Sequence, residues 1–158
     1  MKRTSGFTLI ELVVVITILG ILAAVALPRF ISMQRDARIA KAQGIYGSVR
    51  SASALGKTRC ELDLAEGLTG AGQSGNATPQ VNMDGTLVDI VNRYPAASAT
   101  GIQLAANLDP ANDGLTITAG NPITIDINGA TTLATCRISY TAATAAAAPA
   151  ITLVTTGC

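Results

Sequence analysis

The sequence predicts an α+β fold in which a long N-terminal helix packs on a small antiparallel β-sheet head. Three features of the 158-residue chain predict this fold. The chain begins with an apolar run, continues with apolar residues at helical spacing, and then holds short segments in which apolar and polar residues alternate. Apolar residues make up 49% of the chain, so its low charge, 13% of the residues, does not indicate disorder.

The chain contains no histidine, and this limits its chemistry. Histidine is the commonest metal ligand and a frequent general base. Its absence excludes Ser-His-Asp triads, Cys-His pairs and histidine-zinc sites. No two carboxylates stand out as an acid–base couple. We therefore expect no enzyme, no cofactor and no metal.

The first element is an apolar run from Phe7 to Leu27, in which Glu11 is the single charged residue. A helix of this length spans about 31 Å, the thickness of a bilayer core. A carboxylate in such a segment costs about 2.5–3.5 kcal/mol on insertion scales, so Glu11 is expected to have a function and a partner. The competing interpretation is an ordinary signal anchor with a stray glutamate.

The start of this run carries a family resemblance. The sequence GFTLIEL at residues 6–12 resembles the prepilin motif of the type IV pilin superfamily, and the match continues to Pro28. The resemblance implies the type IV pilin fold, cleavage between Gly6 and Phe7 by a prepilin peptidase, and N-methylation of the new Phe7 amine. It also implies that Glu11, the fifth residue of the mature chain, acts in assembly.

Assembly into a filament gives the motif a physical reason. Removal of the leader, residues 1–6, creates a cationic amine at Phe7, and Glu11 of one subunit could meet that amine on a neighbour. Pairing would offset the desolvation of both charges. By the same resemblance, residues 7–27 first cross the inner membrane, with the N-terminus in the cytoplasm and the head in the periplasm. They then form the helical core of an extracellular pilus.

Gly20 and Pro28 mark the stretch where this helix is expected to kink or melt. Proline removes a backbone N–H and crowds the carbonyl four residues earlier. Glycine lowers helix propensity. The sequence leaves open whether the result is a static kink or a segment that unwinds in the polymer.

Residues 28–58 are predicted to be the amphipathic half of the same helix, which we expect to end near Leu55. An apolar stripe with 3-4-3 spacing, typical of a helix face, consists of Ile39, Ala42, Tyr46 and Val49. This stripe is expected to pack on the head.

Charge is unevenly distributed along the chain. Residues 28–59 hold seven basic residues against Asp36, a sum of +6, and residues 60–158 hold two basic residues against eight acidic ones, a sum of −6. Only Phe30 and Tyr46 accompany the basic block, whereas nucleic-acid sites usually interleave aromatics with cations. We therefore expect a solvated or subunit-facing surface and no specific nucleic acid, with attraction to the acidic heads of neighbouring subunits.

The head, residues 59–158, is predicted to hold a four-stranded antiparallel sheet with one face on the helix stripe. Its strands are expected at residues 115–118, 123–127, 136–141 and 151–154. Asp84-Gly85 indicates a turn before residues 86–91, which form a helix or a strand, and residues 102–106 favour a short helix.

Two loops of the head resemble ligand sites only weakly. The glycine-rich segment Gly67–Gly75 lacks the Gly-Lys-Ser/Thr ending of a phosphate-binding loop, so a surface loop is expected. Asp109, Asn112 and Asp113 offer oxygens that suit calcium. They lack the calcium-loop pattern, and a capped or solvated loop is favoured.

The three cysteines are Cys60, Cys136 and Cys158. An exported head would sit in an oxidising periplasm, where a disulfide is expected. By resemblance to pilins, whose C-terminal segment is commonly tied to the sheet, we pair Cys136 with Cys158. Cys60 is then free or bonded elsewhere, and a Cys60–Cys136 pair remains the alternative.

Shorter matches indicate a position within the superfamily. Arg29-Phe30, residues 93–102, residues 136–141 and the Gly157-Cys158 pair resemble type IVa major pilins of the mannose-sensitive haemagglutinin type. The resemblance implies a structural subunit of a type IV pilus that serves adhesion, biofilm formation or motility. Its partners would be copies of itself, the prepilin peptidase, the inner-membrane assembly machinery and a host or abiotic surface. The alternatives are a pseudopilin of a type II secretion system and a monomeric membrane-anchored binding protein.

Overall fold

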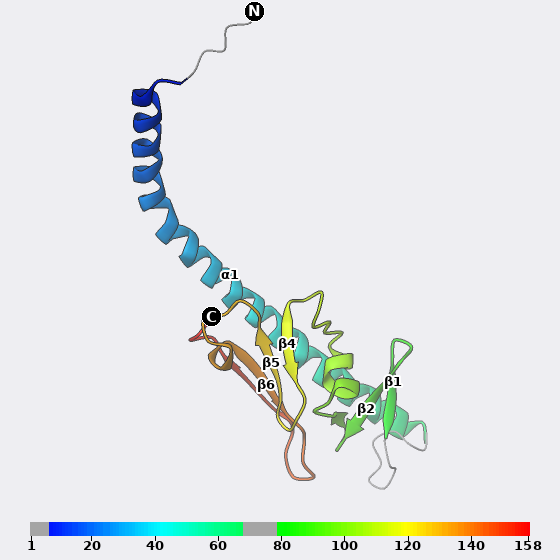
Figure 1. The fold of residues 1–158 in the computed structure, drawn as a ribbon. Coiled ribbons are helices and arrows are strands. Elements are labelled where there is room, and N and C mark those ends of the chain that lie inside the picture. The colour runs from blue at the N-terminus through cyan, green and yellow to red at the C-terminus, as the bar shows by residue number, and fades with distance from the viewer. Residues whose placement is uncertain (1–6, 68–78) are drawn as a thin grey trace, which may run out of the picture. The chain divides into compact units, whose positions relative to one another are not determined.

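A computed structural model describes residues 7–67 and 79–158. The chain divides into two compact units, residues 1–37 and 38–158. Helix α1 (Leu9–Ala65) contributes residues to both units (Figure 1). The seven strands found among the described residues all belong to the second unit, and the structure therefore shows the expected α+β fold of one long helix and antiparallel sheets.

The described part of the first unit is almost entirely helix, and its residues from Phe7 to Ala37 are all exposed to solvent. The helix runs without interruption through Gly20 and Pro28. Alanine and leucine, which are strong helix formers, surround both positions and sustain the helix in the single chain. Melting at these two residues stays a prediction for the assembled protein.

In the second unit, α1 buries one stripe of side chains and ends later than predicted. The buried residues of α1 are Ala42, Val49, Ala52, Ser53, Gly56, Cys60 and Asp63. The stripe thus continues at intervals of three and four residues beyond the predicted end near Leu55. Gly56, which follows the predicted end, is buried and faces the ring of Pro95. Contact with the head therefore extends the helix to Ala65.

The end of α1 packs with a small sheet in the order β1-β2-β3. Its strands are β1 (Gln80–Met83), β2 (Thr86–Val91) and β3 (Tyr94–Pro95). The predicted turn at Asp84-Gly85 joins β1 to β2, and residues 86–91 form a strand rather than a helix. A small apolar cluster under this sheet contains Cys60, Val81, Val88 and Ile90.

The predicted four-stranded antiparallel sheet is confirmed, with the order β4-β5-β6-β7. Its strands are β4 (Leu115–Thr118), β5 (Ile123–Ile127), β6 (Arg137–Thr141) and β7 (Ala150–Val154). A helical turn, η1 (Ala99–Gln103), begins earlier than the predicted helix at 102–106, and a short turn, η2 (Leu133–Thr135), precedes β6.

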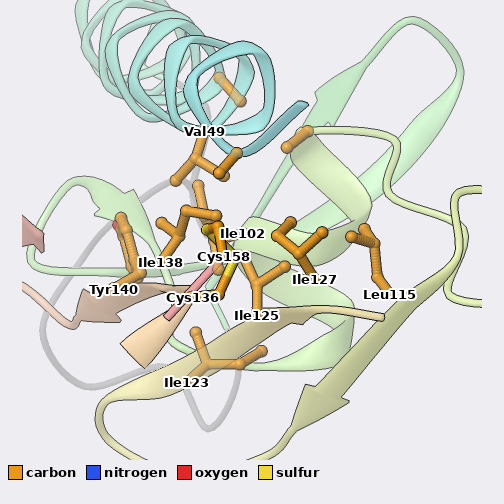
Figure 2. Packing of buried hydrophobic residues seen from close by; sticks show 13 residues of the cluster. Val49, Ile102, Leu115, Ile123, Ile125, Ile127, Cys136, Ile138, Tyr140 and Cys158 are labelled. Carbon is orange, nitrogen blue, oxygen red and sulfur yellow. A yellow bond between two sulfur atoms is a disulfide. The ribbon is translucent and has the colours of Figure 1, made fainter. Parts of the chain in front are cut away.

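The main core lies between α1 and the four-stranded sheet. Figure 2 shows Val49 of α1 pointing toward Ile102, with Ile125 and Ile138 of the sheet in the same cluster. Ala42 and Val49 are fully buried, and Ile39 and Tyr46 pack against the cluster. The predicted helix stripe therefore packs on the head as expected.

Two polar contacts of β6 complete the head. The Tyr140 hydroxyl, fully buried, donates a hydrogen bond of 2.6 Å to the carbonyl oxygen of Pro95 and so links the two sheets. Arg137 donates two hydrogen bonds to the buried carboxylate of Asp126, from Nε to Oδ1 at 2.6 Å and from Nη2 to Oδ2 at 2.9 Å. The Asp126–Arg137 pair follows from the register of β5 and β6, and the Tyr140–Pro95 bond follows from the packing of the two sheets. The sequence pattern specifies neither.

Candidate assembly surface on the N-terminal helix

The first half of α1 presents an apolar surface that no part of the described chain covers. Exposed large apolar side chains recur all around it, from Phe7, which is 90% exposed, through Leu19 and Val25 to Met33. The segment is long and apolar enough to cross a membrane, with a mean hydropathy of 2.8. Soluble monomers rarely expose an apolar patch of more than a few hundred Å², so this surface requires lipid or another chain.

Glu11 lies in the first turn of α1, where Thr8 engages its carboxylate. The backbone N–H and the hydroxyl of Thr8 both donate to Oε2 of Glu11, at 2.9 and 2.8 Å. The backbone N–H of Glu11 lies 3.3 Å from the Thr8 hydroxyl oxygen in return. This reciprocal pattern is a capping box, and its Thr-x-x-Glu signal stands in the sequence at residues 8–11. The prediction of Glu11 as an assembly residue did not include this capping box.

The capping box leaves one side of the carboxylate available. Both Thr8 donors use Oε2, and Oε1 accepts no hydrogen bond from any residue of the described chain. A carboxylate with one oxygen held and the other open is oriented for an external cation. The charge at the start of a helix also opposes the positive end of the helix dipole, which is favourable.

The other polar side chain of the apolar run is satisfied within the helix. The hydroxyl of Thr17 lies 3.0 Å from the carbonyl oxygen of Val13 and 2.8 Å from that of Val14. Such internal bonds let a threonine enter a water-free environment without an unpaired donor. Glu11 is therefore the group of this surface that most needs a partner.

The expected cleavage site lies at the edge of the described chain. Phe7 is exposed and precedes the helix by two residues, whereas Gly6 and the rest of the leader lie outside the described residues. Cleavage after Gly6 would leave the amide of Thr8 in place, so the capping box can exist in the processed chain.

Comparisons with known proteins bear on this surface. Residues 1–27 match the family model described as the prokaryotic N-terminal methylation motif. Over 53 residues the chain is 49% identical to the type IV narrow pilus major component of Thermus thermophilus, a match covering 34% of this chain and 46% of that protein. Over 51 residues it is 43% identical to the type II secretion system core protein G of Pseudomonas aeruginosa, which covers 32% and 36% respectively. No solved structure matches the chain.

A longer match includes the head. The type IV major alpha-pilin of Moraxella bovis is 30% identical over 127 residues, which cover 80% of this chain and 76% of that protein. The chain belongs to the type IV pilin family. Type IV pilins are structural proteins that polymerise after processing by a prepilin peptidase, and membership accounts for an exposed apolar helix joined to a well-packed head.

In this pilin, the C-terminal segment is fastened to the head by the pair of cysteines expected from the resemblance. Cys136 and Cys158 form a disulfide with their Cα atoms 4.8 Å apart, and Cys60 is a free, buried thiol. Burial raises the pKa of the Cys60 thiol. The Nε of Arg38 also donates a 2.6 Å hydrogen bond to the main-chain oxygen of Cys158.

The basic residues of the block are exposed or half-buried, in line with the expected solvated or subunit-facing surface, but several of them also bond within the subunit. Arg38 and Lys41 donate to main-chain oxygens of the head, the latter at 3.2 Å from the oxygen of Gly114. Lys57 and Arg59 pair with acids four residues later in α1, at 3.6 and 2.8 Å. Much of the positive charge of α1 in the second unit is therefore used within the subunit, which leaves less of it for a neighbour.

Neither weak loop resemblance gains support as a ligand site. Residues 68–75 of the glycine-rich segment lie outside the described chain. Asp109 caps its own loop, because Oδ1 accepts the N–H groups of Ala111 and Asn112 at 2.9 and 3.2 Å. Hydrogen bonds from Asn112 and Ala111 hold the pKa of Asp109 below its usual value. Both carboxylate oxygens of Asp109 and one of Asp113 are therefore engaged within this turn.

Proposed function

We propose that this protein is the structural subunit of a type IV pilus that polymerises through α1 into a surface filament for adhesion, biofilm formation or motility. The observation that carries the proposal is the exposed apolar helix whose single carboxylate lies in its first turn. Family membership supports it, because the relatives in Moraxella bovis and Thermus thermophilus bear pilus names.

Processing prepares the subunit. A prepilin peptidase cuts between Gly6 and Phe7, and the new amine of Phe7 is N-methylated. Methylation keeps the positive charge of the amine, so the charge remains available for pairing. The methylation motif at residues 1–27 supports both steps.

Assembly exchanges lipid contacts for contacts between helices. The subunit starts in the inner membrane with its N-terminus in the cytoplasm and its head in the periplasm. Assembly machinery in that membrane then moves it into the filament, where residues 7–27 form the core and 28–58 link the core to the head, residues 59–158. In the core, the amine of a neighbouring Phe7 binds the open oxygen of Glu11, and each charge offsets the desolvation of the other.

The stretch from Gly20 to Pro28 is the part of the core helix that unwinds as subunits pack. Pro28 lacks the backbone donor that would close the preceding turn. Gly20 adds backbone freedom. The single chain is helical here, so melting in the filament would be a change that accompanies assembly.

A pseudopilin of a type II secretion system is the second candidate, favoured by the 43% identity to the core protein G of Pseudomonas aeruginosa. A pseudopilin forms a short periplasmic fibre, whereas a pilin forms filaments that leave the cell and bind a host or abiotic surface. Electron microscopy of sheared surface material separates the two. A monomeric anchored binding protein would form neither fibre.

Replacing Glu11 tests the assembly surface. We expect Glu11→Ala to lower the amount of sheared filament protein more than about ten-fold, because an unpaired amine is left buried in the core. Glu66→Ala, which removes an exposed acid beyond the end of α1, is the control and should assemble normally. The measurement is immunoblotting of sheared and membrane fractions.

The same assay tests whether assembly needs only the charge of Glu11 or also its orientation by Thr8. Thr8→Ser keeps the hydroxyl that bonds Glu11 and should assemble like the wild type, whereas Thr8→Val keeps the shape and loses the bond and should assemble less. Normal filaments from Glu11→Ala, with membrane levels unchanged, would show that the carboxylate has no part in assembly.

A further inference from the structure

An open groove of about 840 Å³ is lined by residues of the second unit alone. Its volume is within the range of ligand-binding sites. Lys57 and Glu61 of α1 form one wall, and Arg93 of the turn between β2 and β3 forms a second together with Tyr94 of β3. The third wall is residues 144–148, in the loop between β6 and β7.

Arg93 occupies a backbone position that does not suit it. Asn92 and Arg93 have positive φ values of 50° and 71°, and they join two paired residues, Val91 and Tyr94. A two-residue hairpin turn of this kind favours glycine at its second position. A residue with a Cβ is strained in this left-handed region, whereas glycine is not.

The two residues of the turn differ in what their side chains do. The Nδ2 of Asn92 donates a 2.9 Å hydrogen bond to the carbonyl oxygen of Ala143 and so holds the third wall against the second. Arg93 is exposed, and it forms no hydrogen bond or ion pair with the residues that the structure describes. Its unfavourable backbone is therefore not explained by packing, and its guanidinium is available to the groove.

The other walls offer a second cation and hydrogen-bonding groups of both kinds. The Lys57 ammonium lies 5.4 Å from the centre of the Tyr94 ring and 3.6 Å from Oε1 of Glu61. Contact with Tyr94 raises the pKa of Lys57, so this cation is charged at neutral pH. Glu61 is half-exposed and can accept further hydrogen bonds. In the third wall, the side chains of residues 145–148 are methyl groups, which leave the main chain accessible.

This combination selects a ligand that is acidic and rich in hydroxyls. A guanidinium binds a carboxylate through two parallel hydrogen bonds. Hydroxyl groups can donate to Glu61 and to carbonyl oxygens and can accept from main-chain N–H groups. A nucleic acid fits less well, because Glu61 repels its denser charge and Lys57 already covers Tyr94, which a base would need for stacking.

We propose that the groove binds uronic-acid units of an acidic polysaccharide, with the sugar carboxylate on Arg93. The site belongs to the single subunit and does not require polymerisation. Failure of the binding test and failure of filament assembly are therefore separate outcomes.

Arg93→Gly gives a sharp test, because glycine is the residue that the turn prefers. The full-length protein in detergent is titrated with polygalacturonate, with neutral dextran as the uncharged comparison. We expect binding of polygalacturonate only, and a loss of at least about ten-fold in affinity for Arg93→Gly. The same variant should unfold at an unchanged or higher temperature, since the turn is relieved.

Two further variants test whether binding depends on the guanidinium of Arg93 in particular. Arg93→Lys keeps the charge without the planar fork and should bind with intermediate affinity. Arg50→Gln removes an exposed arginine of α1 outside the groove and should bind like the wild type. The proposal is overturned if Arg93→Gly binds polygalacturonate as the wild type does, if the wild type does not bind it, or if single-stranded DNA binds more tightly.

Discussion

At the scale of single residues, the head depends on a few buried polar groups with defined partners. Tyr140 is the clearest case, because its hydroxyl lies in the core and bonds the carbonyl oxygen of Pro95 on the other sheet. Burial raises the pKa of Tyr140 to about 12. Its ordinary value is about 10. The folded head therefore holds this proton more tightly than the unfolded chain does.

The raised pKa of Tyr140 predicts a loss of stability at alkaline pH. The contribution of the protonated phenol is complete below about pH 10 and is lost as the pH rises toward 12. Between pH 8 and pH 11 the free energy of unfolding should fall by roughly 1 kcal/mol from this group. Thermal unfolding followed by circular dichroism measures it.

The control compares two tyrosines. Tyr140→Phe should be less stable at pH 8 by about 1–3 kcal/mol, because the Pro95 carbonyl loses its donor. It should also show a smaller fall toward pH 11 than the wild type. Tyr46→Phe, at a half-buried position of α1, should retain the fall. An unchanged alkaline fall in Tyr140→Phe would assign the effect to other groups.

Residue patterns predicted some of these groups and missed others for a physical reason. Glu11 stands out because a charge in an apolar run is costly wherever the run folds. The Asp126–Arg137 pair does not stand out, because its members meet only after β5 and β6 adopt one register. The capping box of Thr8 and Glu11 is local and was predictable from the Thr-x-x-Glu spacing.

At the scale of elements, the length of α1 depends on what its residues contact. The helix was predicted to end near Leu55, and the next residue, Gly56, has a low helix propensity. In the fold, Gly56 is buried, and its lack of a side chain admits Pro95. Tertiary packing thus decides where the helix ends, which propensity alone does not show.

Two glycines of α1 give opposite predictions for the same substitution. Gly44→Ala should raise the free energy of unfolding by about 0.5–1 kcal/mol, because nothing lies within 4 Å of the added methyl and alanine favours a helix. Gly56→Ala should lower it by about 1–3 kcal/mol, since the methyl would lie 2.6 Å from Cγ of Pro95. Thermal unfolding of both variants, side by side, checks the pair. Equal shifts would contradict the packing of α1 on β3.

Some strands were predictable from the sequence and others were not. The four strands from β4 to β7 were predictable because each contains an alternating pattern next to turn residues. The short strands β1 and β3 were not. Strand β3 has only two residues, and β1 (QVNM) contains a single β-branched residue, whereas the equally short β4 (LTIT) contains three. The sheet that extends the contact of α1 was therefore the missing part of the predicted fold.

At the scale of the whole molecule, the two units differ in how they treat their apolar residues. The head buries two apolar clusters and ties its C-terminal segment with the Cys136–Cys158 disulfide. The described part of the first unit buries nothing, although it is the most apolar part of the chain. Such a division fits a protein whose head folds alone and whose helix is completed by lipid or by other subunits.

The N-terminal residue of the protein in sheared surface filaments tests this account most directly. Mass spectrometry of the N-terminal peptide should give a chain that begins at Phe7 and carries one methyl group on its amine. A protein that keeps Met1 through Gly6, and that is recovered only from membranes, would contradict the claim that α1 leaves the bilayer to become a filament core.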